Sequence, residues 1–304
     1  MNNNMSSIKN TVDDSTSQEK NKTEKSTLYL VAVPIGNLAD MSERALKVLS
    51  EVDFIAAEDT RNTQHLLARF GIKKNLVSYY EHNKRQRGEE ITARIEAGES
   101  CALVTDAGMP AISDPGEDLV ALCAEKGITV SCIPGCCAAV TALALSGLPT
   151  GRFAFEGFLS TSKGERNKRL AEIKNEVRTL IFYEAPHKLR TTLDDLYEVF
   201  GDRRIALCRE LTKINEEILR TTLSKAVEIY KEKSPRGEYV LIMEGASSKE
   251  INHLISEENP LLSLSPKDHV SHYEENGLAR MDAIKAAAKD RGMTKSEFYK
   301  LLNN

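Results

Sequence analysis

The sequence predicts a two-domain α/β protein with a parallel-rich sheet in the first domain, a mixed sheet in the second and a small helical C-terminal tail. Three observations support this prediction. Short apolar runs alternate with amphipathic segments from Leu28 onward. The order of the elements changes after a cluster of Gly147, Pro149 and Gly151. A polar stretch over 247–264 then precedes the last 40 positions, 265–304.

The first domain, residues 27–149, shows five strand-then-helix units in succession. Glycines stand where its helices are expected to end, at Gly71, Gly98 and Gly127. Five such units favour a largely parallel, doubly wound sheet. The predicted strands cover 28–33, 54–57, 76–80, 101–105 and 129–133, and the predicted helices cover 42–49, a segment ending at 70, a segment ending before 98, 117–126 and a segment running to 145.

The second domain, residues 150–246, places strands and helices in a different order. Leu189, Leu193, Leu196 and Phe200 recur at helical spacing in its middle. Its predicted strands cover 153–158, 179–184, 204–210, 217–221 and 239–244. This order favours a mixed sheet.

The two ends of the chain differ from the domains in composition. Residues 1–26 are polar and charged with few apolar side chains, which predicts a disordered N-terminal tail. Residues 265–304 predict short helices, including one over 282–291 that Gly292 ends and a last one that Thr294 or Ser296 caps. That arrangement resembles a helix-turn-helix.

Composition narrows the possible functions. The chain of 304 residues has a net charge of −4, which argues against indiscriminate nucleic-acid binding but allows local basic patches. No apolar run predicts a signal peptide or a membrane span, so we expect a cytoplasmic protein that does not bind membranes. Its six cysteines include no Cys-x-x-Cys pair, so we predict neither a metal site nor disulfides.

Three loops follow strands at the same edge of the first predicted sheet. They cover 34–38, 106–116 and 134–138, and ligands of open α/β sheets bind at that edge. The middle loop contains two glycines and two prolines, which would let main chain approach a flat ligand along a rigid path. A nucleotide phosphate loop and a Gly-x-Gly-x-x-Gly turn after the first strand are both missing, which disfavours kinases and dehydrogenases.

Six motifs together resemble one family. They are Val-Pro-Ile-Gly-Asn-Leu at 33–38, Ala-Glu-Asp-Thr-Arg at 57–61, Thr-Asp-Ala-Gly-Met-Pro-Ala-Ile-Ser-Asp-Pro-Gly at 105–116, Pro-Gly-Cys-Cys-Ala-Ala at 134–139, Phe-Tyr-Glu-Ala-Pro-His-Lys-Leu at 182–189 and Arg-Glu-Leu-Thr-Lys at 209–213. In order and spacing they resemble the ribosomal RNA small-subunit methyltransferase I family of the tetrapyrrole methylase superfamily, over about residues 27–302.

The resemblance implies a tetrapyrrole-methylase fold that binds S-adenosylmethionine between two α/β domains. It also implies 2′-O-methylation of the cytidine numbered 1402 in 16S rRNA of the small ribosomal subunit, by a homodimer. Glu184 is a special case, because its carboxylate could face the ribose instead of the cofactor. Carried over by position, the cofactor contacts are Pro34, Ala107, Gly108, Met109, Ile112, Cys137, Ala138, Glu184 and Leu211.

Transfer of a methyl group from a positively charged sulfur requires mainly that the donor and the acceptor oxygen be aligned. A nearby base would speed the reaction further. We consider Glu58, Asp59, His82 and Glu184 for that base and favour Glu58 and Asp59, with Arg61 beside them. Asp59 could equally cap the helix that follows it. Arg61 could pair with the carboxylates or hold a phosphate, and His82 is more typical of an exposed surface position.

Two basic stretches are candidates for RNA binding. Either stretch could instead be a solvated helix face. The C-terminal tail has only a small net positive charge between Lys267 and Lys300, which weakens it as a further candidate for RNA binding. The predicted RNA-binding residues are Lys84, Arg85 and Arg87 in the first stretch and Lys163, Arg166, Lys168 and Arg169 in the second.

Two other functions stay open at this point. The fold could serve a porphyrinoid carbon methyltransferase, in which case tetrapyrrole would accept labelled methyl and ribosomal subunits would not. The chain could also be a helix-turn-helix regulator with a ligand-sensing α/β body, in which case it would form a salt-sensitive complex with duplex DNA.

Overall fold

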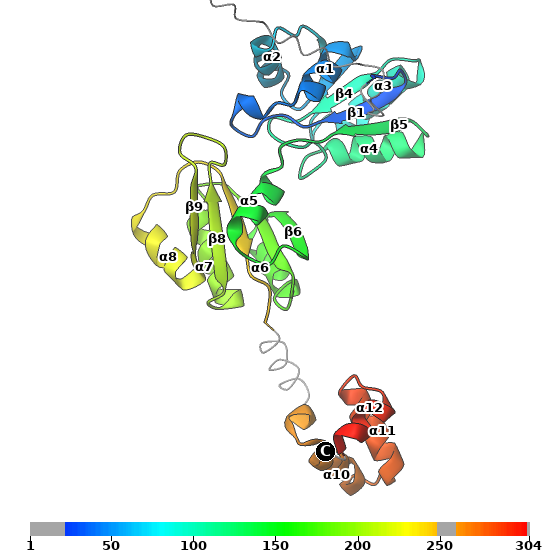
Figure 1. The fold of residues 1–304 in the computed structure, drawn as a ribbon, viewed down its shortest axis with the longest axis vertical. Coiled ribbons are helices and arrows are strands. Elements are labelled where there is room, and N and C mark those ends of the chain that lie inside the picture. The colour runs from blue at the N-terminus through cyan, green and yellow to red at the C-terminus, as the bar shows by residue number, and fades with distance from the viewer. Residues whose placement is uncertain (1–21, 248–259, 303–304) are drawn as a thin grey trace, which may run out of the picture. The chain divides into compact units, whose positions relative to one another are not determined.

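The computed structural model describes residues 22–247 and 260–302 of the chain (Figure 1). It divides into two compact units. The first contains residues up to Ala138 together with Leu211–Lys213, and the second contains the remainder. The boundary therefore falls at the first residue of helix α5 (Ala138–Ser146), about a dozen residues earlier than the glycine and proline cluster near 150.

The first unit is a five-stranded parallel sheet, which confirms the predicted parallel sheet, and its strand order is β3-β2-β4-β1-β5. Side chains from α1 and α2 pack with one face of the sheet, and side chains from α3 and α4 pack with the other. The sheet is thus doubly wound. The elements are β1 (Thr27–Val31), α1 (Glu43–Glu51), β2 (Phe54–Ala57), α2 (Thr60–Arg69), β3 (Asn75–Ser78), α3 (Lys84–Glu96), β4 (Cys101–Val104), α4 (Gly116–Glu125) and β5 (Thr129–Ile133), with a 3₁₀ turn η1 (Leu38–Asp40) after β1.

Local signals explain where these helices begin and end. The Ser42 hydroxyl accepts a hydrogen bond from the Ala45 N–H at 3.1 Å and caps α1. Gly127 follows α4 at a φ of +68°, a left-handed conformation that L side chains rarely adopt.

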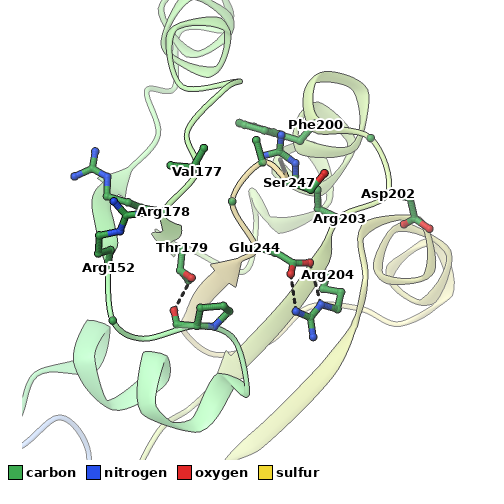
Figure 2. A pocket seen from close by; sticks show the side chains of 15 residues that line it. Arg152, Val177, Arg178, Thr179, Phe200, Asp202, Arg203, Arg204, Glu244 and Ser247 are labelled. Carbon is green, nitrogen blue, oxygen red and sulfur yellow. Dashed lines mark hydrogen bonds and ion pairs between the residues drawn. The ribbon is translucent and has the colours of Figure 1, made fainter. Parts of the chain in front are cut away.

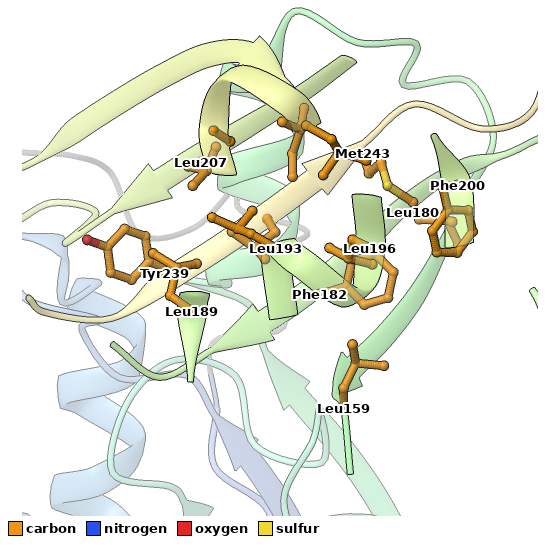
Figure 3. Close-up of a cluster of buried hydrophobic side chains, with 14 of the residues drawn as sticks. Leu159, Leu180, Phe182, Leu189, Leu193, Leu196, Phe200, Leu207, Tyr239 and Met243 are labelled. Atoms are coloured by element: carbon orange, nitrogen blue, oxygen red, sulfur yellow. The ribbon is translucent and has the colours of Figure 1, made fainter. Parts of the chain in front are cut away.

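The second unit contains a mixed five-stranded sheet with order β6-β7-β10-β8-β9. Strands β6 and β7 are parallel, and the remaining pairs are antiparallel. Its main core lies where α6, α7 and α8 cover one face, with Phe182 and Leu193 at its centre (Figure 3). The elements are α5, β6 (Phe153–Phe158), α6 (Lys163–Glu172), β7 (Thr179–Glu184), α7 (Leu189–Phe200), β8 (Arg204–Arg209), β9 (Glu217–Thr222), α8 (Leu223–Glu232) and β10 (Tyr239–Met243).

The C-terminal helices have a small core of their own, centred on Phe298 and Ile284. Beside it, the buried His269 contacts the Asp290 carboxylate through Nε2 at 3.1 Å and accepts a hydrogen bond from Arg291 Nε at Nδ1, also at 3.1 Å. Helices α11 and α12 correspond to the two predicted helices. The elements are η2 (Pro260–Ser263), α10 (Pro266–Glu275), α11 (Arg280–Asp290) and α12 (Lys295–Leu302).

The predicted N-terminal tail and linker fall largely outside the described residues, at 1–21 and 248–259. Of the tail, Lys25 lies within the described part and forms an ion pair with Asp53 at 2.6 Å. Across 22–247 and 260–302, every helix is too short or too polar to cross a bilayer.

Candidate functional site

The carboxyl edge of the first sheet brings the three predicted loops together. Strand β1 lies between β4 and β5, so the loops that follow these strands leave the sheet side by side. The Val33 N–H donates to the Gly108 carbonyl at 2.9 Å, and the Gly108 N–H donates back to the Val33 carbonyl at 3.1 Å. This isolated bridge fastens the glycine-rich loop to the end of β1.

Glycines are required where these loops meet. Gly108 has a φ of +84°, and a Cβ placed on it would lie 3.2 Å from the Ile35 side chain and 3.4 Å from the Cys136 carbonyl. A Cβ on Gly135 would lie 2.9 Å from that of Ala32. The two glycines therefore let the three loops pack closely against one another. The predicted cofactor residues Pro34, Ala107, Gly108, Met109, Cys137 and Ala138 all lie on these three loops.

The loop between β4 and α4 is strained and braced. Ala111 and Ser113 have φ values of 66° and 65°, which cost of order 1 kcal/mol for residues with a side chain. One carboxylate oxygen of Asp114 accepts hydrogen bonds from the Ala111 N–H at 3.0 Å and the Gly116 N–H at 2.7 Å. Between the two strained residues the Ile112 side chain is 43% exposed. The brace thus presents an apolar side chain, a predicted cofactor contact, to solvent.

Leu211, another predicted cofactor contact, belongs to the first unit although it lies far along the chain. Its side chain is buried. Two residues further on, the aliphatic part of Lys213 lies so close to Gly36 that a Cβ on that glycine would come within 2.4 Å of it. Thr212, between them, has a φ of 65°. The loop Leu211–Lys213, which also contains a residue at positive φ, therefore forms part of the first unit.

Glu184 lies in the second unit, at the end of β7. Only 4% of the residue is exposed. One carboxylate oxygen accepts from the Ala185 N–H at 2.8 Å, and the other accepts from the Thr192 hydroxyl at 2.5 Å. The side chain thus links the end of β7 to helix α7, which is a local structural role.

The three predicted catalytic residues follow β2 at the same carboxyl edge. The exposed Glu58 carboxylate accepts a hydrogen bond from the Thr105 hydroxyl at 2.8 Å. Asp59 caps α2 by accepting from the Arg61 N–H at 2.8 Å and the Asn62 N–H at 3.4 Å. These bonds, the one from the Arg61 N–H first, hold the pKa of Asp59 below its ordinary value. The capping alternative for Asp59 is therefore present in the structure, which leaves Glu58 as the more available base.

Sequence reasoning missed two residues of this polar cluster. The Asn62 amide donates to the Asp106 carboxylate at 3.0 Å and so connects α2 to the loop after β4. Both residues follow neighbouring strands of a parallel sheet, and that placement could have indicated them. Arg61 differs from them, because its side chain is 87% exposed and lies 3.6 Å from Asp59.

The first basic stretch is partly neutralised by acidic neighbours. Lys84 pairs with Glu81 at 2.8 Å and with Asp118 at 2.7 Å. Arg87 pairs with Glu90 on the same helix. Arg85 is exposed, so it is the most available cation of this stretch.

The second basic stretch contains a buried arginine. Arg166 forms an ion pair with Asp195 at 2.6 Å and donates to the Ser160 carbonyl at 3.0 Å. Its side chain is only 10% exposed, so it connects α6 to α7 and is not a surface cation. Lys163 and Lys168 are exposed, and Arg169 pairs with Glu156 and Glu172.

The cysteines lie in two environments. Cys101, Cys123 and Cys208 are buried free thiols, and burial raises the pKa of both Cys123 and Cys208 to about 11. Cys137 lies on the third loop of the candidate site and is half-buried. Among residues 22–247 and 260–302, no three His, Cys, Asp or Glu side chains gather as a metal site would require. A metal-free reaction stays a prediction.

Comparisons with known proteins identify the architecture. A family model described as Tetrapyrrole (Corrin/Porphyrin) Methylases matches residues 27–227. Among solved structures, a diphthine synthase has a TM-score of 0.56 at 15% identity and covers 72% of this chain and 90% of its own. A cobalt precorrin-4 methyltransferase has a TM-score of 0.53 at 15% identity, over 72% of this chain and 95% of its own. The fold and its glycine-lined edge thus define the class of two-domain α/β methylases.

Curated relatives resemble the chain over nearly its whole length. Ribosomal RNA small subunit methyltransferase I of Halalkalibacterium halodurans is 50% identical over 278 residues, which are 91% of this chain and 95% of the relative. The protein of that name from Bacillus subtilis is 45% identical over 278 residues, 91% of this chain and 94% of its own. The chain belongs to the tetrapyrrole methylase family and, within it, to the ribosomal RNA small subunit methyltransferase I family.

Proposed function

We propose that this chain is a cytoplasmic, homodimeric enzyme that transfers a methyl group from S-adenosylmethionine to the ribose 2′-oxygen of cytidine 1402 in 16S rRNA. One observation carries this proposal. The chain is 45–50% identical, over about nine tenths of its length, to relatives named for small-subunit rRNA methylation. The exact acceptor atom and the dimer rest on the family resemblance.

The first unit provides groups that fit the methyl donor. Gly108 and Gly135 leave no side chain where the three loops meet, and Ile112, on the same loop as Gly108, exposes an apolar side chain. Such a surface suits a flat adenine ring and main-chain hydrogen bonds. When bound, S-adenosylmethionine would supply a methyl group whose bond to the positively charged sulfur breaks during transfer, which leaves a neutral thioether. Pro34, Ala107, Gly108, Met109, Ile112, Cys137, Ala138 and Leu211 would hold the cofactor, and Glu184 would act through the main chain of Ala185.

The polar cluster beside this surface can take the proton of the ribose hydroxyl that accepts the methyl group. A ribose hydroxyl loses its proton as its oxygen bonds to the methyl carbon, and a positioned carboxylate takes that proton. Glu58 is exposed and held by Thr105, so it fills this role. Asp59 holds the start of α2, and Arg61 extends into solvent where it can pair with an RNA phosphate.

The test is methyl transfer itself. Small ribosomal subunits that lack the modification are incubated with the full chain and labelled S-adenosylmethionine, and the labelled nucleotide is mapped. We expect label on the 2′-oxygen of cytidine 1402. Label on a base, or transfer to a tetrapyrrole in place of the subunit, would overturn the assignment. A salt-sensitive complex with duplex DNA and no transfer to RNA would favour the regulator alternative.

A further inference from the structure

The second unit contains a cavity of about 770 Å³ that the proposed function does not use (Figure 2). It lies at the end of the sheet where β6, β7 and β8 begin and β10 ends. Glu184 is at the other end of β7, about 17 Å away for a strand of this length. The cavity is lined by Pro149, Gly151, Arg152, Val177, Arg178, Thr179, Phe200, Gly201, Asp202, Arg203, Arg204, Glu244, Gly245, Ala246 and Ser247.

Two of its arginines are exposed on the rim, on the same side of the cavity in Figure 2. Within the described part of the chain, no carboxylate lies within ion-pair distance of Arg152. The Arg178 side chain is 45% exposed and pairs with Glu176 at 2.6 Å. The pair uses the Nε and Nη2 groups of Arg178, at 2.9 and 2.6 Å, and a guanidinium has five N–H donors, so the remaining donors can contact a phosphate. The rim therefore presents two guanidinium groups to an incoming anion.

The two further arginines differ in burial, because Arg203 is largely buried whereas the Arg204 side chain is 57% exposed. Arg203 donates to the Lys174 carbonyl at 3.0 Å and lies with its guanidinium carbon 5.0 Å from the centre of the Phe200 ring. Arg204 forms a two-pronged ion pair with Glu244, at 2.9 Å from Nε and 2.5 Å from Nη2. Packing holds Arg203 in place, and Arg204 is a third exposed arginine of the lining, paired with Glu244.

The two carboxylates that line the cavity are already engaged. Glu244 pairs with Arg204. Asp202 accepts a hydrogen bond from the Ser224 N–H at 2.8 Å, and this bond to the start of α8 holds the pKa of Asp202 below its ordinary value. Four arginines against two carboxylates leave the lining net positive.

We propose that this cavity binds backbone phosphates of the rRNA substrate, as a second docking point about 17 Å from the end of the sheet that carries Glu184. The inference rests on the proposed function, because a small ribosomal subunit is large enough to reach both places. Arginine is suited to this task, since its planar fork matches phosphate oxygens in a two-pronged geometry. The cavity brings four arginines from separate parts of the chain to one concave surface.

The test compares charge-matched variants of the full chain. The double variant Arg152→Gln with Arg178→Gln removes two exposed cations from the rim, and Lys47→Gln with Lys73→Gln removes two exposed cations from the first unit. Affinity for undermodified small subunits is measured at several salt concentrations, together with kcat, KM and the affinity for S-adenosylmethionine.

For the rim variant we expect KM for the subunit to rise about tenfold or more, and the slope of log affinity against log salt to flatten by about two. We expect kcat and cofactor affinity to stay within twofold, and the control variant to behave like wild type. Arg152→Gln alone, which breaks no ion pair, should give about half the change in slope.

Equal KM and salt slope in the rim and control variants would overturn the proposal. So would a rim variant that loses binding of inorganic pyrophosphate or a mononucleotide while its RNA affinity is unchanged, because the cavity would then hold a small anion. If wild type methylates a different acceptor but the rim variant still loses subunit affinity, the proposed function fails and the docking point stands.

Discussion

The glycine-lined edge of the first unit and the arginine cavity of the second unit are both suited to ligands, yet they are built from different groups. At the first, main chain meets main chain, as the reciprocal hydrogen bonds of Val33 and Gly108 show. At the second, charged side chains line the cavity, as in the pairing of Arg204 with Glu244. A main-chain site is damaged by adding atoms, whereas a side-chain site is damaged by removing charge. The two regions should therefore respond to opposite kinds of substitution.

The largest expected effect tests how far the second unit depends on charged side chains. Arg166→Ala leaves the largely buried Asp195 without its partner, and we expect a loss of about 3–5 kcal/mol in the free energy of unfolding. Thermal unfolding measures it. Arg87→Ala, which breaks a half-exposed pair, should cost under about 1 kcal/mol.

A further variant separates charge from packing at the same position. Arg166→Met combined with Asp195→Leu should recover most of the stability, because no unpaired buried charge remains. Equal losses for Arg166→Ala and Arg87→Ala would show that the second unit does not rely on this buried pair.

The next effect concerns chemistry at the first unit's edge. Glu58→Gln removes the proposed proton acceptor but keeps an oxygen for Thr105, so kcat should fall about a hundredfold with little change in KM. Asp59→Asn retains the helix cap, because asparagine caps as well as aspartate, and should stay near wild type. Rates of methyl transfer to small subunits measure both. If kcat falls more for Asp59→Asn than for Glu58→Gln, Asp59 is the proton acceptor and Glu58 is not.

A smaller effect tests the main-chain character of that edge. Gly108→Ala places a Cβ against Ile35 and the Cys136 carbonyl, so the loops must shift by a few tenths of an ångström. We expect S-adenosylmethionine to bind about tenfold more weakly by calorimetry. Gly127→Ala has a similarly positive φ but open space around it, so it should lose stability and keep cofactor affinity. Equal cofactor affinity in the two variants would contradict a main-chain site.

The smallest effect extends the contrast to the tail, where side chains again hold the structure. Burial lowers the pKa of His269, and the hydrogen bond to Asp290 opposes this shift, while Arg291 and His272 add to it and Tyr273 stacks on the ring. With a depressed pKa in the folded state, the stability from neutral His269 is full above its ordinary value of 6.5 and is lost as pH falls below it.

Hydrogen exchange in peptides from 266–302 measures this pH dependence. Protection, corrected for intrinsic rates, should fall severalfold between about pH 7 and pH 5. His269→Gln can donate to Asp290 and accept from Arg291 without titrating, so its protection should vary less with pH. An equally steep dependence in that variant would assign the effect to another group.

Periodicity predicted the fold class and every strand of both sheets, because hydrophobic alternation and glycine stops are local signals. The same strand pattern predicted the loops that meet at the first sheet's edge, because the loops after parallel strands leave the sheet at one edge. The burial of Arg166 could not be predicted, because its partner Asp195 is 29 positions away. Nor could the arginine cavity, since Arg152, Arg178 and Arg203 come together only when the second sheet forms. Local sequence shows charge, and tertiary structure decides where that charge lies.

The tripeptide Leu211–Lys213 has a practical consequence for dissecting the molecule. It belongs to the first unit although the chain enters that unit again only after β8. A gene fragment that stops at Ala138 therefore encodes an incomplete body, missing the side chain that lies over Gly36. To express the first unit alone, the segment Leu211–Lys213 should have to be added to the fragment. A fragment that begins after Ala138 would contain this segment without the first-unit residues that it contacts.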